Sequence, residues 1–458
     1  MKRNIILKVD SYKTSQWNCY NPEMVNMHSY LESRGGPSDS VLFFGLQYYL
    51  KEYLAGQVVT QENIDEADTF YKAHFGRDDV FNRAGWEYIL KEYGGRLPLV
   101  IRAVQEGSRV PVKNVLMTIE ATDEKCAWLV NYVETLLLKV WYPATILTRS
   151  NGIYKDIAAA LEKSGDITGL PFKCHDFGYR GCTSEEQAAI GGAAHLASGF
   201  MGSDTIAGIL MANKYYGAAM SGFSIPATEH SVITSFGQKK EGQAFGHFLN
   251  QYSGLRACVS DTYNIFDACE QLWGGVLREQ IKIEGNTLVV RPDSGDYMEV
   301  VPTILEILWD KFGGIVNAKG YKVLNPCVRV IQGDSMCPET IKALYDKIME
   351  LGWSADNLAV GSGGGLLQEN AVRDLHKFAI KASAVQLKDG SWMDVYKDPI
   401  TDQGKMSKRG RLKLVIGDNG YETVRENDPR ENQLVEVFRN GVVTKEWTFD
   451  EVRARANS

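Results

Sequence analysis

The chain has 458 residues, of which 44% are hydrophobic and 23% are charged, a composition typical of an ordered globular protein rather than a disordered one. This length allows more than one domain, and a barrel of about 250 residues could form the larger share. The net charge of −7 argues against a general nucleic-acid-binding protein, because affinity for a phosphate backbone comes from clustered Lys and Arg.

The first residues, MKRNIILKVDSYK, contain an apolar run too short for a secretory signal. No later stretch approaches 18 uninterrupted apolar residues, so the sequence predicts no membrane span. The eight cysteines are scattered without a CxxC pair, which favours reduced structural thiols over a disulfide framework or a zinc site. We therefore expect a cytoplasmic protein.

The first third of the chain combines aromatic-rich helical patterns, such as VLFFGLQYYLKEYLAG at residues 41–56, with polar connections, and it shows no repeat and no catalytic signature. From about residue 170, short apolar runs end in polar or glycine-rich turns and alternate with helical patterns, which is typical of βα units. The predicted strands end in KCHDFGYRG, GFSIPATEH, ACVSDTYN, LVVRPDSGD, CVRVIQGD and NLAVGSGGG, with MGSDTIAG as a candidate seventh. Strands that alternate with helices imply a parallel sheet, open or closed into a barrel.

Two segments between the predicted strands have apolar residues at the helical spacing i, i+3, i+4 and i+7. They are Val301, Ile304, Leu305 and Leu308, and Ile341, Leu344, Tyr345 and Ile348. After about residue 375 the βα pattern fades, and LVEVFRNGVVTKEW predicts a hairpin, because Asn440-Gly441 can take the positive φ values of a tight turn. We expect a β/α barrel over residues 146–374 and a second, α+β domain formed by residues 1–145 together with 375–458.

Polar residues follow the predicted strands, and the carboxyl ends of parallel strands face one site. These residues are Arg180, Asp204, His230, Asp261, Arg291, Asp293 and Asp334, with the glycines Gly361, Gly363, Gly364 and Gly365. A glycine-rich turn before a helix can hold a phosphate, arginine binds phosphate oxygens through paired hydrogen bonds, and aspartate accepts from sugar hydroxyls or holds Mg²⁺ through water. Together these groups indicate a phosphorylated sugar, and they suit a reaction in which pyrophosphate leaves a ribose carbon.

His230 follows Glu229 at the end of a predicted strand. A neighbouring carboxylate can orient an imidazole and leave its other nitrogen nucleophilic, so His230 is a candidate general base or phosphoryl acceptor. The other histidines form no recognisable metal-ligand spacing.

Seven motifs in chain order, HDFGYRG, GSDTIAG, PATEHS, VSDTYN, RPDSG, RVIQGD and GSGGGLLQ, resemble those of the nicotinamide phosphoribosyltransferase family, and the resemblance runs from DSYK at Asp10 to VTKEWTFDEVR near the end. The resemblance implies a type II phosphoribosyltransferase fold with an irregular parallel β/α barrel, in a homodimer with shared active sites. It implies transfer of the 5-phosphoribosyl group from phosphoribosyl pyrophosphate to nicotinamide, giving nicotinamide mononucleotide and pyrophosphate, in NAD salvage. It also implies Mg²⁺ as cofactor and ATP as co-substrate, with ATP hydrolysis coupled through a phosphohistidine.

The resemblance further implies roles for residues around the nicotinamide ring. Phe177 and, from the partner subunit, Tyr12 would stack on the two ring faces. Asp204 would accept a hydrogen bond from the carboxamide, and Ser224 is retained in the pocket. Where the family pattern leads us to expect a pocket serine, the chain has Ala257, so one polar contact is missing; substrate affinity would change, but the reaction would not.

The remaining implied roles concern the phosphoribosyl group and the reaction itself. Arg180 and Arg291 would contact the surroundings of the ring and the pyrophosphate, and Asp293, Gly333 and Asp334 would contact the ribose hydroxyls. Asp261 and Asp293 would hold Mg²⁺ through water. Gly363, Gly364 and Arg373 would hold the 5'-phosphate, with Arg34, Lys381 and Lys397 completing a basic rim across the dimer. The catalytic group would comprise His230, which accepts a phosphoryl group from ATP, with Glu229, Arg291 and Asp293.

Three other functions are compatible with parts of the sequence. A nicotinate phosphoribosyltransferase would have a similar architecture, but the carboxylate of Asp204 would meet the like charge of nicotinic acid. A non-catalytic binding or signalling protein on the same fold has no need for His230, both strand-end arginines and all three sugar-side aspartates, which are all present. A barrel lyase or aldolase needs a Schiff-base lysine at a strand end, and no lysine ends any predicted strand.

Overall fold

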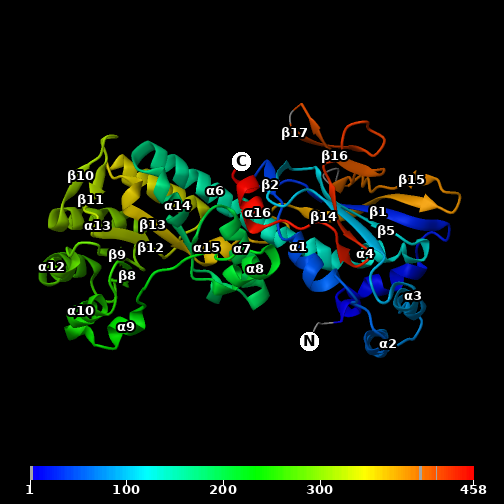
Figure 1. Ribbon diagram of the computed structural model, residues 1–458, viewed down its shortest axis with the longest axis horizontal. Coiled ribbons are helices and arrows are strands. Elements are labelled where there is room, and N and C mark those ends of the chain that lie inside the picture. The colour runs from blue at the N-terminus through cyan, green and yellow to red at the C-terminus, as the bar shows by residue number, and fades with distance from the viewer. Residues whose placement is uncertain (1–3, 402–404, 419) are drawn as a thin grey trace.

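The computed structural model describes residues 4–401, 405–418 and 420–458 of the chain. Figure 1 shows a body of parallel strands and surrounding helices at one end of the long axis, and a second body around a large antiparallel sheet at the other. Helix α6 (Trp141–Ser164) lies between them and packs on both, with contacts to β2 (Ser40–Leu42) on one side and to α14 (Pro338–Glu350) on the other. No helix of the described residues is long and apolar enough to cross a membrane.

The sheet of the second body combines strands from both ends of the chain. Its seven strands lie in the order β15-β14-β1-β5-β3-β18-β19. They are β1 (Met24–Ser33), β3 (Leu99–Ala103), β5 (Val115–Ala121), β14 (Phe378–Leu387), β15 (Trp392–Asp394), β18 (Val435–Arg439) and β19 (Val442–Val443). Because β1 pairs antiparallel with β14 as well as with β5, the N- and C-terminal segments form one domain, as the sequence predicts.

Short strands and helices complete this second domain. They are β4 (Arg109–Pro111), which pairs with β2, the hairpin β16–β17 (Leu412–Gly417 and Gly420–Arg425), and the helices α1 (Leu46–Tyr49), α2 (Gln61–Phe75), α3 (Arg83–Tyr93), α4 (Leu129–Tyr132), α5 (Glu134–Leu137) and α16 (Phe449–Ala456). The expected domain boundary at residues 145 and 146 falls inside α6.

The other body is an irregular barrel with a six-stranded parallel sheet in the order β7-β6-β13-β12-β9-β8. Its strands are β6 (Cys174–Asp176), β7 (Gly202–Ser203), β8 (Leu255–Val259), β9 (Thr287–Arg291), β12 (Val328–Gln332) and β13 (Leu358–Ser362). The fold class predicted from the sequence is therefore confirmed.

The other helices and strands of the barrel body are α7 (Glu185–Ala197), α8 (Ile206–Tyr216), α9 (His230–Thr234), α10 (Glu241–Gln251), α11 (Ile265–Asp267), α12 (Arg278–Ile281), α13 (Tyr297–Phe312), α14, α15 (Gly364–Leu367), and the pair β10 (Gly314–Val316) and β11 (Lys322–Leu324).

The barrel is closed by a segment that is not a regular strand. Residues 223–227 make only isolated parallel bridges, from Phe223 to Gly202 on one edge of the sheet and from Ala227 to Ala257 on the other. The prediction of a strand in GFSIPATEH was wrong in this respect, because Pro226 has no N–H to donate to a sheet. Its carbonyl still accepts the N–H of Ala257 at 2.9 Å.

The predicted helices of the barrel are confirmed. Val301, Ile304, Leu305 and Leu308 are buried on one face of α13, and the corresponding residues of α14 are buried in the same way. The hairpin between β18 and β19 is also confirmed, with φ of 48° at Asn440 and 80° at Gly441.

The helix expected over residues 41–56 is shorter than predicted. The first residues of this segment belong to β2, and α1 starts only at Leu46 and continues as a π-helical turn to Leu54. Gly45, with φ of 96°, separates the strand from the helix. Its left-handed conformation cannot form part of a right-handed helix, so the helix starts only after it.

Candidate active site

A cavity of about 940 Å³ opens at the carboxyl ends of the barrel strands. Loops after β6, β7, β9, β12 and β13 line it, as a parallel sheet requires. The sequence-predicted residues in its lining are Phe177, Arg180, Asp204, Arg291, Gly333, Asp334, Gly363 and Gly364. The convergence expected from the strand ends is therefore present for this group.

Phe177 follows β6 directly and its ring packs against the neighbouring strand β13. A Cβ atom at Gly361 of β13 would lie 1.8 Å from Cε2 of Phe177, so only glycine allows the ring to occupy this place. The guanidinium carbon of Arg291 lies 5.4 Å from the centre of the ring, within the range of a cation–π contact. The phenyl ring is thus fixed in position and can stack on a flat ligand.

Asp204 follows β7 and its exposed carboxylate faces the same cavity. The hydroxyl of Ser224 donates a short hydrogen bond to this carboxylate. The backbone N–H of Asp204 donates to the carbonyl of Asp176 at 2.9 Å. These contacts attach the acceptor carboxylate to the strand that carries Phe177, so ring slot and acceptor form one unit.

Asp176 is a residue of this unit that sequence reasoning missed. Its side chain is fully buried, and its Oδ1 accepts the N–H of Gly178 at 2.7 Å, which holds the turn around Phe177. Burial raises the pKa of this carboxyl from 3.8 to about 6, against the hydrogen bond from Gly178. The signal was available, since Asp176 lies in HDFGYRG, but only residues expected to touch a ligand were selected.

His230, Asp261, Asp293 and Arg291 form a connected group beside the cavity. Nη2 of Arg291 donates to Oδ1 of Asp293 at 2.8 Å, and Oδ2 of Asp261 accepts the N–H of Asp293 at 3.0 Å. Nε2 of His230 lies 3.6 Å from Oδ1 of Asp261 and 3.7 Å from Oδ2 of Asp293. Two carboxylates therefore face one imidazole nitrogen.

The orientation of His230 differs from the one expected. Its Nδ1 lies 3.2 Å from the hydroxyl of Thr262, and its Nε2 faces Asp261 and Asp293, whereas the carboxylate of Glu229 accepts a hydrogen bond from Ser231. Glu229 has an extended backbone, and adjacent side chains along extended backbone point to opposite sides. The expectation that Glu229 orients His230 was therefore wrong, and the carboxylates that face His230 are those of Asp261 and Asp293.

The same group has the chemistry to hold Mg²⁺. Oδ1 of Asp261 is buried and has no hydrogen-bond partner, which leaves a carboxylate oxygen to face a cation. The described residues include no cluster of three or more His, Cys, Asp or Glu that could hold a metal alone. Mg²⁺ commonly binds through one or two carboxylates, water and substrate phosphate, and Asp261 with Asp293 fits that kind of site.

The glycine turn after β13 lines the same cavity as Arg291 of this group. Gly363 and Gly364 lead into α15, and the first N–H groups of a helix have no acceptor within it. A Cβ atom at Gly365 would lie 2.3 Å from the carbonyl oxygen of Met336, so the turn packs closely on the loop after β12. Gly333 is also tightly placed, because a Cβ there would lie 3.0 Å from both Asp293 and Arg291.

The other predicted residues do not line this cavity. Arg373 pairs with Asp374 on the surface at 2.8 Å. The remaining residues, Tyr12, Arg34, Lys381 and Lys397, belong to the second domain, whose sheet contains β1, β14 and β15. Tyr12 is 61% exposed.

The three cations of that set, Arg34, Lys381 and Lys397, are termed here the second-domain basic group. Burial lowers the pKa of Lys381, Glu134 opposes this shift, and the nearby Arg34 and Lys397 add to it. These cations are therefore gathered together, although one chain does not bring them to the cavity.

Comparison with known proteins agrees with this geometry. Residues 172–442 match the nicotinate phosphoribosyltransferase (NAPRTase) family, and residues 4–101 match the nicotinamide phosphoribosyltransferase N-terminal domain. The chain is 47% identical to the nicotinamide phosphoribosyltransferase of Xanthomonas campestris, over 99% of this chain and 98% of that protein. The chain belongs to the nicotinamide phosphoribosyltransferase family. The resemblance that the seven motifs indicated is confirmed.

Other relatives support the same assignment. The nicotinamide phosphoribosyltransferase of Acinetobacter baylyi is 31% identical over 91% of this chain and 88% of its own length. Among solved structures, nicotinate-nucleotide pyrophosphorylase from Pyrococcus furiosus matches with a TM-score of 0.63 at 16% identity, over 99% of this chain and 95% of that chain. Human nicotinic acid phosphoribosyltransferase matches with a TM-score of 0.56 at 16% identity, over 98% and 92%. These structures share the fold of this nicotinamide phosphoribosyltransferase family member.

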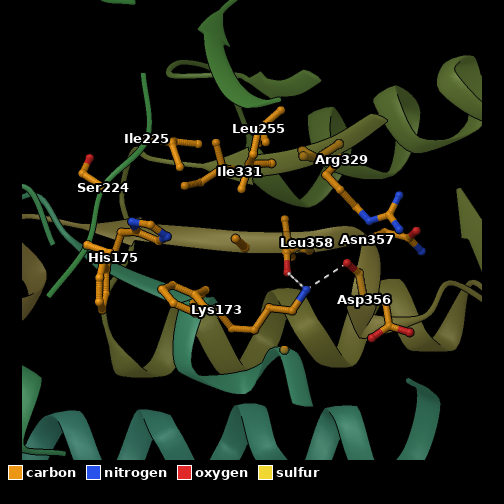
Figure 2. A pocket seen from close by; sticks show the side chains of 16 residues that line it. Lys173, His175, Ser224, Ile225, Leu255, Arg329, Ile331, Asp356, Asn357 and Leu358 are labelled. Atoms are coloured by element: carbon orange, nitrogen blue, oxygen red, sulfur yellow. Dashed lines mark hydrogen bonds between the residues drawn. The ribbon is translucent and has the colours of Figure 1, made fainter. Parts of the chain in front are cut away.

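This family member also has a second cavity, of about 330 Å³, inside the barrel. Figure 2 shows that His175 and Ser224 lie at one end of it and Arg329 and Asn357 at the other, with the side chain of Lys173 extending between them toward Leu358 and Asp356. Burial lowers the pKa of Lys173 to about 8 and also lowers that of His175. Sequence reasoning missed these residues, although Lys173, His175 and Phe177 alternate along β6 and so point to the same face.

Ala257 packs in the middle of the barrel, in an apolar cluster with Val289 and Ile331 that Phe177 also contacts. Its methyl group offers no hydrogen bond there. The missing polar contact expected from the sequence is therefore replaced by apolar packing beneath the ring slot.

Proposed function

We propose that this chain transfers the 5-phosphoribosyl group from phosphoribosyl pyrophosphate to nicotinamide, giving nicotinamide mononucleotide and pyrophosphate, in NAD salvage. One observation carries the proposal: the stacking ring of Phe177, the acceptor carboxylate of Asp204 and the anion-binding guanidinium of Arg291 line one cavity of about 940 Å³. The curated relatives named as nicotinamide phosphoribosyltransferases support it across nearly the full chain.

Asp204 favours the amide over the acid as substrate. Its carboxylate can accept a hydrogen bond from the carboxamide NH₂ of nicotinamide, and the hydroxyl of Ser224 already occupies a position on it. The carboxylate of nicotinic acid has no hydrogen to donate and would meet a like charge at close range. The same aspartate therefore selects for one substrate and against the other.

The reaction needs positioning and charge more than covalent participation by the protein. The ring nitrogen of nicotinamide attacks C1 of the ribose as the bond to pyrophosphate breaks, through an oxocarbenium-like state. Arg291 and Arg180 neutralise the departing pyrophosphate, and Asp334 and Asp293 hold the ribose hydroxyls so that C1 faces the ring. Mg²⁺ held by Asp261 and Asp293 would add positive charge at the pyrophosphate.

We propose that His230 accepts the γ-phosphoryl group of ATP, which is then hydrolysed to drive product formation. The support is its geometry: Nδ1 lies 3.2 Å from the hydroxyl of Thr262, which can orient the ring, and Nε2 lies 3.6 Å from Asp261 and 3.7 Å from Asp293, beyond hydrogen-bond distance, so this nitrogen is left to attack phosphorus. His230→Ala should abolish ATP-stimulated turnover and leave slow basal synthesis. Full ATP stimulation in this variant would remove the phosphohistidine role.

We also propose a homodimer in which each cavity is completed by its partner. Exposed apolar residues follow Asp204 along the chain: Ile206 is 62% exposed, Leu210 60% and Met220 57%. Exposed apolar residues clustered beside a functional site are typical of an interface. The partner subunit would bring its own Tyr12 and second-domain basic group to the cavity.

We propose a cytoplasmic location as well. All eight cysteines are unpaired, which supports it.

The proposed reaction can be tested by mass spectrometry of purified protein incubated with phosphoribosyl pyrophosphate, Mg²⁺ and either nicotinamide or nicotinic acid. The expected product is nicotinamide mononucleotide, with much less nicotinic acid mononucleotide. Preferential formation of the acid product would support a nicotinate enzyme instead. If neither product forms, the result would support a non-catalytic protein.

A further inference from the structure

The glycine turn of the proposed phosphate site is held from behind by one arginine of α6. Nη1 of Arg149 donates to the carbonyl oxygens of Gly365 at 3.1 Å and Leu366 at 2.9 Å, and Nη2 donates to that of Glu369 at 2.8 Å. The hydroxyl of Tyr142 donates to the carbonyl of Leu367 at 2.9 Å. Residues seven apart lie on the same face of a helix, so α6 presents both donors to the same turn.

These bonds engage the carbonyl side of the turn. The last carbonyl groups of a helix have no partner within it, and α15 is only four residues long, too short to be stable without tertiary contacts. The guanidinium supplies those contacts and places a positive charge at the negative end of the helix. Gly363 and Gly364, at the opposite end of α15, line the cavity, as do Gly365, Gln368 and Glu369.

Arg149 has no competing task in the structure. Among the described residues its side chain forms no ion pair, and all its hydrogen bonds go to carbonyl oxygens of the segment 365–369. The adjacent Thr148 accepts the N–H of Leu42 at 2.9 Å, which attaches this part of α6 to β2. The second domain therefore fixes the helix, and the helix fixes the turn.

We propose that Arg149 is a positioning residue for the 5'-phosphate: it holds the turn at Gly363 and Gly364 so that its N–H groups converge on the phosphate. The inference rests on the proposed function for the identity of the ligand. Arg149 does not touch the substrate, so its effect is specific to the phosphate end of phosphoribosyl pyrophosphate and does not extend to the nicotinamide slot.

The test compares wild type with Arg149→Met, Arg149→Lys and Tyr142→Phe, using ribose 5-phosphate as the probe. Calorimetric affinity should fall about tenfold or more in Arg149→Met, because a partly buried charged donor is lost from three acceptors. Arg149→Lys should be intermediate, because lysine keeps the charge but not the planar set of donors. Tyr142→Phe should have the smallest effect. The KM for phosphoribosyl pyrophosphate should rise in the same order, while the KM for nicotinamide stays within about twofold.

A matched control is Arg329→Met. Arg329 also donates only to backbone carbonyls, those of Leu324, Asn325 and Val328, but at the other end of the barrel. It should lower the melting temperature without a selective loss of ribose 5-phosphate affinity.

Two results would overturn the inference: unchanged ribose 5-phosphate affinity in the Arg149 variants, or a loss that is equal for nicotinamide and reproduced by Arg329→Met. If Arg149→Met does not fold, the Lys and Tyr142→Phe variants decide between the outcomes. If ribose 5-phosphate binding depends on Arg149 but the wild type forms no nicotinamide mononucleotide, the proposed reaction fails and this inference stands.

Discussion

At the scale of single residues, Asp204 has the proposed role of selecting an amide over an acid substrate. It combines a carboxylate on the cavity with a hydroxyl donor from Ser224, so removing the charge should alter substrate preference more than folding. Asp204→Ser is expected to raise the KM for nicotinamide about tenfold or more, because a hydrogen bond to a charged group is lost, and to improve the relative use of nicotinic acid.

Chromatographic separation of the two products from mixed substrates measures this ratio directly. Ser224→Ala, which leaves the carboxylate in place, is the control and should change the ratio less. An unchanged amide preference in Asp204→Ser would show that another residue selects the substrate.

Asp176 makes a prediction about pH. Burial raises its pKa from 3.8 to about 6, so the folded state binds the proton more tightly than the unfolded state, and this carboxyl lowers the free energy of unfolding as pH rises through that range. Between pH 4.5 and pH 7 the cost grows by about 2 kcal/mol. Asp176→Asn keeps the acceptor for the N–H of Gly178 and removes the titration.

Urea unfolding of both proteins at the two pH values isolates this effect from every other titrating group. Relative to wild type, Asp176→Asn should be more stable at pH 7 than at pH 4.5 by about that amount. A difference between the two proteins that does not vary with pH would mean that Asp176 is ionised throughout.

At the scale of secondary structure elements, the loop after β6 can pack on β13 only because Gly361 has no side chain, which leaves room for the ring of Phe177. Gly361→Ala would place a Cβ atom 1.8 Å from Cε2 of Phe177, so the ring must leave its position. The KM for nicotinamide should rise about tenfold or more, because aromatic stacking on the ligand is lost.

The double variant of Gly361→Ala with Phe177→Ala separates this cause from others. It should be no worse than Phe177→Ala alone, since no ring remains to be displaced. Gly152→Ala, in α6 with nothing within 4 Å of its new Cβ, should leave kinetics unchanged. Additive losses in the double variant would contradict the proposed contact.

The same scale shows why some elements were predictable and others were not. β9 and β12 are apolar runs that end in a polar turn, and both the run and the turn are local signals. The segment around Pro226 has the same pattern, but it closes the barrel through isolated bridges, and this depends on which strands become the sheet edges. The sequence prediction did not include His175 and Lys173, because it selected only residues at strand ends. Every second side chain along a barrel strand also points into the barrel, and these two do.

At the scale of the whole molecule, the residues with proposed roles in the reaction fall into two sets that one chain does not bring together. Arg291 and Asp334 line the barrel cavity, whereas Lys381 lies on β14 of the second domain. The sequence places both sets in order along the chain, but it contains no information on which copy of the chain a given residue serves. A symmetric dimer brings the same two surfaces together twice, and this predicts a specific behaviour of mixed variants.

Arg291→Ala and Lys381→Ala should each be nearly inactive, one through the barrel and the other through the second domain. In a mixed dimer with shared sites, one site carries both defects and the other carries neither. Random mixing makes half of the dimers mixed, so refolding the two variants together should restore about a quarter of wild-type activity. Arg291→Ala mixed with Asp334→Ala is the control: both defects lie on the barrel cavity, so each mixed dimer has one defect in each site and no activity returns. Two results would contradict shared sites: a first mixture that stays as inactive as its components, or a fully active monomer in light scattering. Each chain would then complete its own site, and the second-domain basic group would not act on the cavity of a partner.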